Sequence, residues 1–248
     1  MMTGNAVVDR PDPQAGAPRR PGTALLVVRA VVAMLILPAV VLFAAAGRLD
    51  WPMAWVYVIV LTAFTLGSRL IIFRKYPDLV AERAHALEKK DTKPWDRVLV
   101  PIVAIYGPMA LLLVAGLDKR NGWSPEVASG VQIAAMVVVA AAILFAAWAM
   151  AVNRFFSGTV RIQKDRGHTV VTDGPYRFVR HPGYSASVLV HFAAPLALGS
   201  LWALVPGVLV ASALVVRTAL EDRTLQEELD GYRDYARRVR FRLLPGVW

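Results

Sequence analysis

The chain contains no cysteine, and only 19% of its residues are charged. The lack of cysteine excludes disulfide bonds, a thiolate nucleophile and cysteine-ligated metal sites. The histidines, His85, His168, His181 and His191, do not show the HExxH or HxxxH spacing of zinc sites, so we expect no metal. No P-loop, no GxGxxG fingerprint after a strand and no GxSxG nucleophile motif is visible. The sequence therefore gives no sign of a zinc hydrolase, a P-loop enzyme or a serine hydrolase.

Hydrophobic residues, in contrast, make up 56% of the chain. Several apolar runs reach the roughly 20 residues that an α-helix needs to cross a bilayer. The net charge of +10 could indicate a nucleic-acid partner, but the basic residues lie between the apolar runs and do not gather in one soluble region. The composition predicts an integral membrane protein that does not bind nucleic acid.

The apolar runs predict an all-α fold, a polytopic transmembrane helical bundle of about four spans plus a C-terminal helical hairpin. The predicted spans cover residues 24–46, 53–73, 98–117 and 128–152. The apolar run 184–217 is too long for one helix, and we expect two helices joined near Leu198-Gly199-Ser200. This hairpin either crosses the membrane fully or re-enters from one side.

The polar segments divide the chain further. We interpret residues 1–22 as a disordered basic tail and 23–152 as transmembrane helices 1–4 with an amphipathic linker at 74–97. In that linker, apolar residues recur at helical spacing at Leu79, Val80, Ala84 and Leu87. Residues 153–248 then form a cofactor-binding region with the hairpin 184–217 and an amphipathic helix in the tail 218–248. Arg69, near the end of the second span, is expected to snorkel to the interface.

Lysine and arginine are unevenly distributed over these segments. Four lie in 1–29, seven in 74–97, six in 153–183 and seven in 217–248, whereas the other connections hold only Arg48, Lys119 and Arg120. If each span and both arms of the hairpin cross the membrane, every basic-rich segment falls on the same side. The positive-inside rule makes that side cytoplasmic.

The segment Gly174–Tyr184, GPYRFVRHPGY, is the most chemically dense part of the chain. Its two prolines fix φ and favour extended geometry before them, and its two glycines permit unusual backbone. We interpret it as a rigid, irregular segment at the membrane surface that holds polar groups around a ligand. The alternative is a basic loop that only anchors the chain to anionic headgroups.

Arg217 and Glu221 are four residues apart, so on a helix they share one face at the mouth of the hairpin. The simple interpretation is an i,i+4 ion pair on a solvated helix. The sharper hypothesis makes Glu221 an acceptor for a ribose or amine and Arg217 a partner for an anionic substrate group.

Three stretches carry a resemblance to a known family: HTVVTDGPY at 168–176, RHPGY at 180–184 and RTALED at 217–222, with a closing LPG at 244–246. Over roughly residues 150–248 the chain resembles the isoprenylcysteine carboxyl methyltransferase family and its phospholipid methyltransferase relatives. Two departures are Glu221-Asp222, where the family usually has two glutamates, and a shorter spacing from Gln163 to His168 than in eukaryotic members.

The resemblance implies S-adenosylmethionine as the cofactor, bound at the cytoplasmic face beside the last membrane helices. Arg217 and Glu221 would be the catalytic residues, with Arg217 positioning the substrate. The residues that match the family's cofactor-binding positions are Gln163, His168, Thr169, Val170, Val171, Tyr176, His181, Pro182, Gly183, Tyr184 and Glu221.

The sequence therefore predicts a multi-pass membrane methyltransferase with its active site facing the cytoplasm. Its partners would be membrane lipids and a lipophilic small molecule that carries an isoprenoid- or lipid-like carboxylate or another small nucleophile. One alternative is an NADPH-dependent sterol-type reductase, since such enzymes carry a similar RHPNY, although Gly183 here replaces the asparagine. A non-catalytic membrane binding protein is the other alternative.

Overall fold

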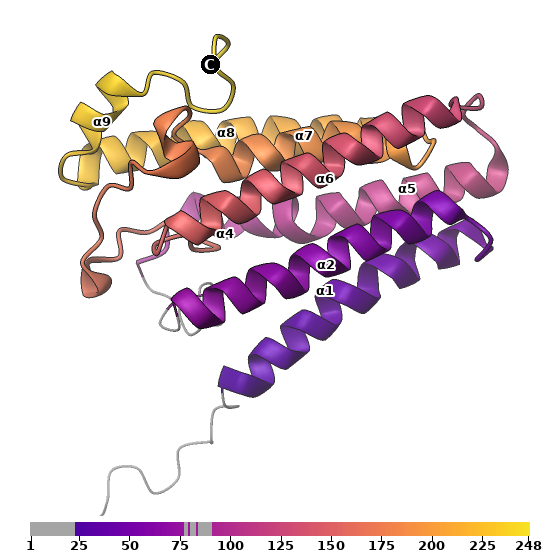
Figure 1. The fold of residues 1–248 in the computed structure, drawn as a ribbon, viewed down its shortest axis with the longest axis horizontal. Helices are drawn as coiled ribbons and strands as arrows, with labels where there is room; N and C mark the ends of the chain where they lie inside the picture. Colours follow the sequence, from indigo (N-terminus) through magenta and orange to yellow (C-terminus); the bar gives the residue numbers. More distant parts are fainter. Residues whose placement is uncertain (1–22, 77–78, 80–82, 84–90) are drawn as a thin grey trace, which may run out of the picture.

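The computed structural model describes residues 23–76, 79, 83 and 91–248, with side chains from residue 35 onward. Those residues form helices and connecting segments without strands, and the long helices lie side by side as a bundle (Figure 1). The principal helices are α1 (Thr23–Ala46), α2 (Pro52–Lys75), α4 (Pro94–Pro101), α5 (Gly107–Asn121), α6 (Ser129–Val152), α7 (Pro182–Ala197), α8 (Leu204–Glu228) and α9 (Tyr232–Arg238). The prediction of an all-α polytopic bundle is confirmed.

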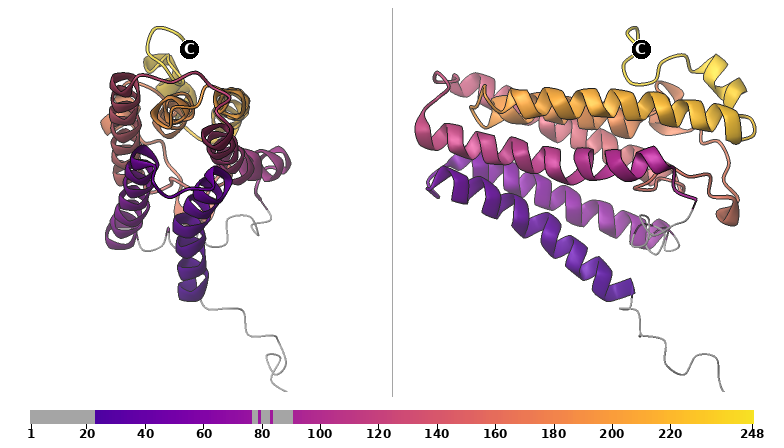
Figure 2. Two further views of the ribbon diagram at one scale, coloured as in Figure 1. Left: turned by 90° about the vertical axis from the view of Figure 1, so that its right-hand side faces the viewer. Right: turned by 180° about the vertical axis from the view of Figure 1, so that it is seen from behind.

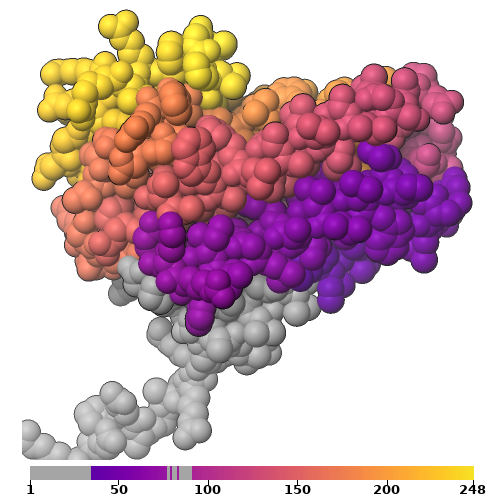
Figure 3. Space-filling model, viewed as in Figure 1, coloured from indigo at the N-terminus to yellow at the C-terminus, as the bar shows by residue number. Residues whose placement is uncertain are grey.

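Four helical stretches in the described residues are long and apolar enough to cross a membrane. They are Pro52–Lys75, Pro94–Asn121, Ser129–Val152 and Leu204–Glu228. Large apolar side chains on α2 and α6 remain exposed, including Ile59, Phe73, Val137 and Leu144. Both helices lie at the surface of the face shown in Figure 3. Outward-facing apolar surface of this extent suits contact with lipid rather than water.

The third span is one continuous helical rod of three parts. A π-helical turn at Ile102–Tyr106 joins α4 to α5, between Pro101 and Pro108. Proline removes a backbone hydrogen bond and a π turn absorbs the irregularity, so the rod continues without breaking. At Gly107 a Cβ atom would lie 2.1 Å from Val210 Cγ2, which shows why glycine allows α8 to pack closely here.

The two hairpin helices also pack through a small residue. A Cβ on Gly207 of α8 would lie 2.4 Å from the carbonyl oxygen of His191 on α7. The tip of the hairpin is fastened to the end of α5, because Ser200 donates a hydrogen bond to the Asp118 carboxylate at 2.5 Å. Leu201 N–H donates to Ser124 Oγ at 2.9 Å. The hairpin therefore runs the full length of the bundle, which favours crossing over re-entry.

The short and the long connections lie at opposite ends of the bundle. The connections after α1, α5 and α7 lie at one end, and the long segments after α2, α6 and α8 lie at the other (Figures 1 and 2). All the described basic-rich segments thus share one end, as the alternation of the spans predicts. The predicted amphipathic helix at 74–97 falls mostly outside the described residues, as does the predicted disordered tail 1–22.

Two local predictions were wrong. The tail 218–248 is not one amphipathic helix: α8 continues to Glu228, and Gly231, at φ +78°, separates it from the short α9. Apolar residues of this tail still pack in one cluster, among them Leu225, Leu229, Tyr232, Tyr235 and Val239. The segment Gly174–Tyr184 is also not irregular throughout, since α7 begins at Pro182, where proline suits the first helical turn.

Candidate active site

A cavity of about 590 Å³ lies where the polar end of the bundle meets the segment 153–181. Its volume is typical of small-molecule sites. Every site residue predicted from the sequence lines this cavity: Gln163, His168, Thr169, Val170, Val171, Tyr176, His181, Pro182, Gly183, Tyr184, Arg217 and Glu221. Apolar side chains complete the wall from the membrane side: Leu61, Phe64, Val103, Ala142, Ile143 and Ala146. The cavity thus joins a polar half to an apolar half.

Gln163 and His168 are held by a tight turn whose αL residue is Gly167, at φ +62°. Gln163 is buried, and its side-chain amide donates to the carbonyl oxygen of Phe155 at 2.8 Å. Its backbone N–H donates to His168 Nδ1 at 3.3 Å, and the His168 ring lies 4.5 Å from the Phe155 ring centroid. Burial, with the nearby positive charges of Arg166 and Arg161, lowers the pKa of His168 to about 4. The imidazole is therefore neutral at pH 7.

Tyr176 anchors the segment between α6 and α7. Its hydroxyl accepts a hydrogen bond from Asn153 Nδ2 at 2.8 Å, and its carbonyl oxygen accepts one from the Tyr235 hydroxyl at 2.8 Å. Burial raises the pKa of Tyr176 above its usual range, so the hydroxyl stays neutral. Val170 and Val171 pack against the same apolar cluster. These contacts fix one wall of the cavity through a network that connects to the C-terminal helix.

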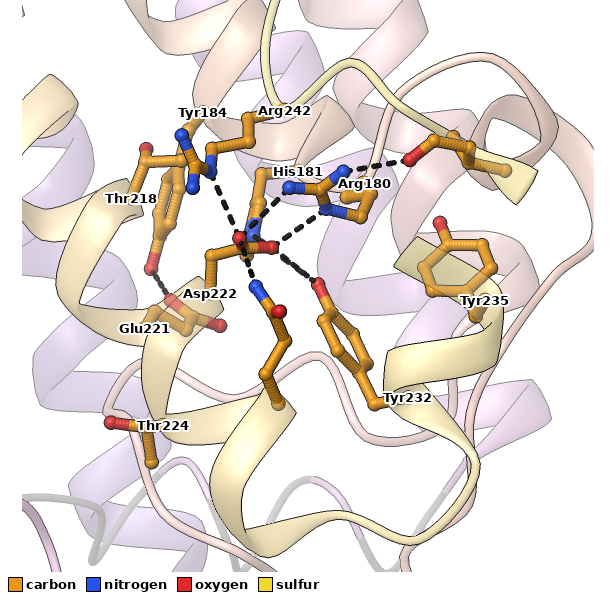
Figure 4. Close-up of polar contacts among 12 residues, drawn as sticks. Arg180, His181, Tyr184, Thr218, Glu221, Asp222, Thr224, Tyr232, Tyr235 and Arg242 are labelled. Carbon is orange, nitrogen blue, oxygen red and sulfur yellow. Dashed lines mark hydrogen bonds and ion pairs between the residues drawn. The ribbon is translucent and has the colours of Figure 1, made fainter. Parts of the chain in front are cut away.

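Tyr184 and Glu221 meet across the hairpin. The Tyr184 hydroxyl donates to Glu221 Oε2 at 2.5 Å, as Figure 4 shows. The Tyr184 ring stacks on His181, with centroids 5.8 Å apart and an interplanar angle of 7°. The two motifs, 37 residues apart in sequence, therefore present a carboxylate, a phenol and an imidazole to one cavity.

Arg217 does not have Glu221 as its partner carboxylate. Its guanidinium donates from Nε to Asp96 Oδ1 at 2.7 Å and from Nη2 to Asp96 Oδ2 at 3.1 Å. It also donates to the Gly158 carbonyl at 3.0 Å and lies 5.0 Å from the Tyr184 ring centroid. Arg217 thus forms a buried, bidentate ion pair with Asp96 of α4 instead of the simple i,i+4 pair with Glu221.

Asp222 is the centre of a buried polar network beside the cavity (Figure 4). Its carboxylate is fully buried and receives two hydrogen bonds from Arg180, at 2.7 and 2.8 Å. Tyr232 donates to it at 3.0 Å and Arg242 at 2.9 Å. His181 Nε2 lies 3.3 Å from the same carboxylate. Asp222 thereby fixes the His181 ring and ties the C-terminal tail to the loop before α7.

The sequence reasoning missed Asp96 and the role of Asp222. The sequence shows Asp222 only as a departure from the family's pair of glutamates. Two adjacent carboxylates at the end of an apolar helix nevertheless indicate a functional site. Asp96 gave no such signal, because a single acid before an apolar run is common at an interface. Arg69 was expected to snorkel, but it is half-buried and lines the cavity.

The arrangement suits the binding and orientation of a ligand that has both a polar and an apolar part. In the part of the chain that the structure describes, no group of three or more His, Cys, Asp or Glu side chains could hold a metal ion. The cavity offers the Glu221 carboxylate to a cationic or hydroxyl group. The apolar half can hold a hydrocarbon chain.

Comparison with known proteins shows what this part of the chain is similar to. The model of the isoprenylcysteine carboxyl methyltransferase (ICMT) family matches residues 133–227, which run from α6 through α7 to α8 and include all the predicted site residues. No curated protein matches the chain. The resemblance to the isoprenylcysteine carboxyl methyltransferase family, predicted from the motifs, is therefore confirmed over residues 133–227 of this membrane protein.

Proposed function

We propose that the protein is an integral-membrane, S-adenosylmethionine-dependent methyltransferase that acts on a lipophilic small molecule. One observation carries this proposal: two motifs distant in sequence line a single cavity whose other half is apolar and faces the membrane helices. A polar site for a soluble cofactor and an apolar site for a hydrocarbon thus share one space. The match to a methyltransferase family supports the same conclusion.

The residues at the polar half fit a cofactor that carries a carboxylate, an ammonium, a ribose and a cationic sulfur. Glu221, half-buried and bonded to Tyr184, can accept from an amine or a ribose hydroxyl. The rings of Tyr184, His168 and Phe155 give this half of the cavity an aromatic lining against which the heteroaromatic part of the cofactor can pack. The neutral His168 adds no positive charge against the sulfonium. When bound, S-adenosylmethionine supplies an electrophilic methyl group.

The chain's own contribution is alignment and the exclusion of water. The Asp222 network fixes His181 and the start of α7, and the Arg217–Asp96 pair fixes the opposite side of the cavity. Preorganised groups of this kind can supply several kcal/mol by orienting two reactants. A carboxylate acceptor needs no general base, and we assign none. Arg217 positions the acceptor, because its guanidinium faces the cavity beside Tyr184.

We further propose that the cavity opens toward the cytoplasm. The described segments rich in lysine and arginine all lie at the end of the bundle that contains it (Figure 1). A water-soluble cofactor would then enter from the cytoplasm, and a lipophilic acceptor would arrive from the bilayer. The proposed partners are therefore membrane lipids and a lipophilic small molecule.

Calorimetry of the purified protein with S-adenosylhomocysteine and with NADPH tests the proposed cofactor. We expect saturable binding of S-adenosylhomocysteine and none of NADPH. Incubation with methyl-labelled S-adenosylmethionine and a membrane lipid extract should then transfer label into the organic phase. Binding of NADPH alone would contradict the proposal and support a sterol-type reductase. Binding of neither compound would support a non-catalytic membrane protein.

A further inference from the structure

Arg83 lines the same cavity but is not one of the predicted site residues. Its Nε donates to the Phe156 carbonyl oxygen at 3.0 Å, and its Nη2 lies 3.8 Å from Met150 Sδ. Its guanidinium stands 5.4 Å from the Phe156 ring centroid. All of these contacts are to uncharged groups. In the described part of the chain, the positive charge of Arg83 therefore has no carboxylate contact.

A second arginine reinforces this positive charge. Arg69, on α2, lines the same cavity. Burial, together with the charge of Arg69, lowers the pKa of Arg83 to about 10. Arg83 is therefore still charged at pH 7. A cation removed from water without a paired anion is costly, so a ligand anion at Arg83 would offset that cost.

Arg83 is close to the proposed methyl-donor site. The Phe156 ring contacts both: it lies under the Arg83 guanidinium and its Cζ–Cε2 edge lies against Gly183. A Cβ atom on Gly183 would lie 2.7 Å from Phe156 Cζ, so the ring contacts the backbone of the RHPGY motif directly. An anion held at Arg83 would thus be about one aromatic ring away from the residues that line the polar half.

Arg83 and Arg217, two of the arginines that line the cavity, differ in the charge that they can offer to a ligand. Arg217 already shares a bidentate ion pair with Asp96. Among the described residues, Arg83 contacts a carbonyl, a thioether and a ring face. An anionic ligand would gain more from Arg83, because no carboxylate of the described residues competes with it there. The apolar Leu61 and Phe64 line the same cavity and can contact an attached hydrocarbon chain.

We propose, building on the proposed function, that Arg83 together with Arg69 forms a subsite for the anionic group, a carboxylate or a phosphate, of a lipophilic ligand. The ligand lies with its charged group between α2 and α6 and its apolar chain among the membrane helices. The subsite thereby selects anionic amphiphiles over neutral ones of the same chain length. It involves no covalent step.

The test measures the binding of three probes of equal chain length to the full-length protein in neutral detergent micelles. Dodecyl phosphate and dodecanoate carry the proposed group, and dodecanol lacks it. We expect the wild-type protein to bind both anionic probes with roughly tenfold or more higher affinity than dodecanol, because only the anionic probes can form a charge-assisted hydrogen bond with Arg83. Equal affinity for all three would overturn the proposal without requiring any variant.

Substitutions then assign the preference to Arg83. Arg83→Gln should lower the affinity for the anionic probes roughly tenfold and leave dodecanol unchanged, whereas Arg83→Lys should retain part of the preference. Arg74→Gln, at the exposed end of α2, removes the same charge from the same end of the bundle and should change nothing. The subsite would be overturned if the Arg83→Gln protein kept the full preference for anionic probes. It would also be overturned if the variant lost affinity for dodecanol to the same extent as for the anionic probes.

Titration of S-adenosylhomocysteine into the same proteins separates this proposal from the proposed function. If the wild type and Arg83→Gln bind S-adenosylhomocysteine equally and only the variant loses the anion preference, the proposed function and the subsite are both supported. Loss of S-adenosylhomocysteine binding in Arg83→Gln, with anion preference intact, would overturn the subsite alone. No S-adenosylhomocysteine binding by the wild type would overturn the function but not the anion preference. Competition by phosphatidylglycerol would identify a bilayer lipid as the ligand, and its absence a smaller amphiphile; both support an anionic subsite.

Discussion

Replacement of Asp222 by asparagine should destabilise the protein strongly. Both carboxylate oxygens accept hydrogen bonds from charged donors. Oδ1 accepts from Arg180 Nε and Tyr232, and Oδ2 accepts from Arg180 Nη2 and Arg242. An asparagine amide keeps one oxygen and places an NH₂ group where the other was. Whichever way the amide is oriented, at least one arginine N–H then faces a donor instead of an acceptor.

The cost follows from burial and charge. The Asp222 side chain is fully buried and that of Arg180 is 5% exposed, so water cannot replace the lost acceptor. Breaking a buried ion pair from one side costs about 3–5 kcal/mol. For a domain of this size, each kcal/mol shifts the melting temperature by about 2–4 °C, so a decrease of roughly 6–20 °C is expected.

Thermal unfolding in detergent, followed by intrinsic fluorescence, measures this decrease. Glu227→Gln is the matched control, because Glu227 lies on the same helix, is exposed and pairs only with the exposed Arg223. The control should shift the free energy of unfolding by no more than about 0.5 kcal/mol. An Asp222→Asn protein that melts within about 2 °C of the wild type would refute the reasoning that this network holds the site together.

Three further predictions concern the cavity itself. Glu221→Ala should weaken S-adenosylhomocysteine binding while the protein stays folded, since Glu221 contributes one hydrogen bond, to Tyr184; unchanged affinity in calorimetry would remove Glu221 from the cofactor site. Arg217→Ala should lower turnover more than S-adenosylhomocysteine affinity, and it should also cost about 3–5 kcal/mol of stability because Asp96 loses its partner; equal losses of turnover and affinity would count against a substrate role. The folded-state pKa of His168, about 4, lies below its unfolded value near 6.5, so the unfolded chain binds a proton that the folded protein does not. Its contribution to stability should thus be complete above pH 6.5 and be lost as the pH falls toward 4, and His168→Asn should flatten this part of the stability profile; an identical pH profile in the variant would contradict the assignment.

The membrane spans were predictable from the sequence because the bilayer requires long apolar helices. The third span illustrates this: neither Pro101 nor Pro108 ended it, since a π turn absorbs the irregularity. The tail was not predictable in the same way. Its apolar residues follow a helical period, but Gly231 in the αL region divides it, and no periodicity shows where α8 will stop.

The cavity wall was predictable only where a motif existed. His181, Tyr184 and Glu221 were identified together because recognisable stretches carry them, and they do line one cavity. Asp96 and Arg83 carry no motif. Their role depends on how α4 and the segment before it pack against α6 and α8, and helix rotation of that kind cannot be derived from single-chain periodicity.

The central claim is that the loop 163–184 and the start of the acidic stretch of α8 enclose a methyl donor. Ultraviolet cross-linking of methyl-labelled S-adenosylmethionine to the purified protein, followed by peptide mass spectrometry, tests it most directly. We predict that the label appears in peptides covering 163–184 or 217–228 and is displaced by excess S-adenosylhomocysteine. Label confined to the opposite end of the bundle, around residues 118–128 or 198–203, would contradict the account.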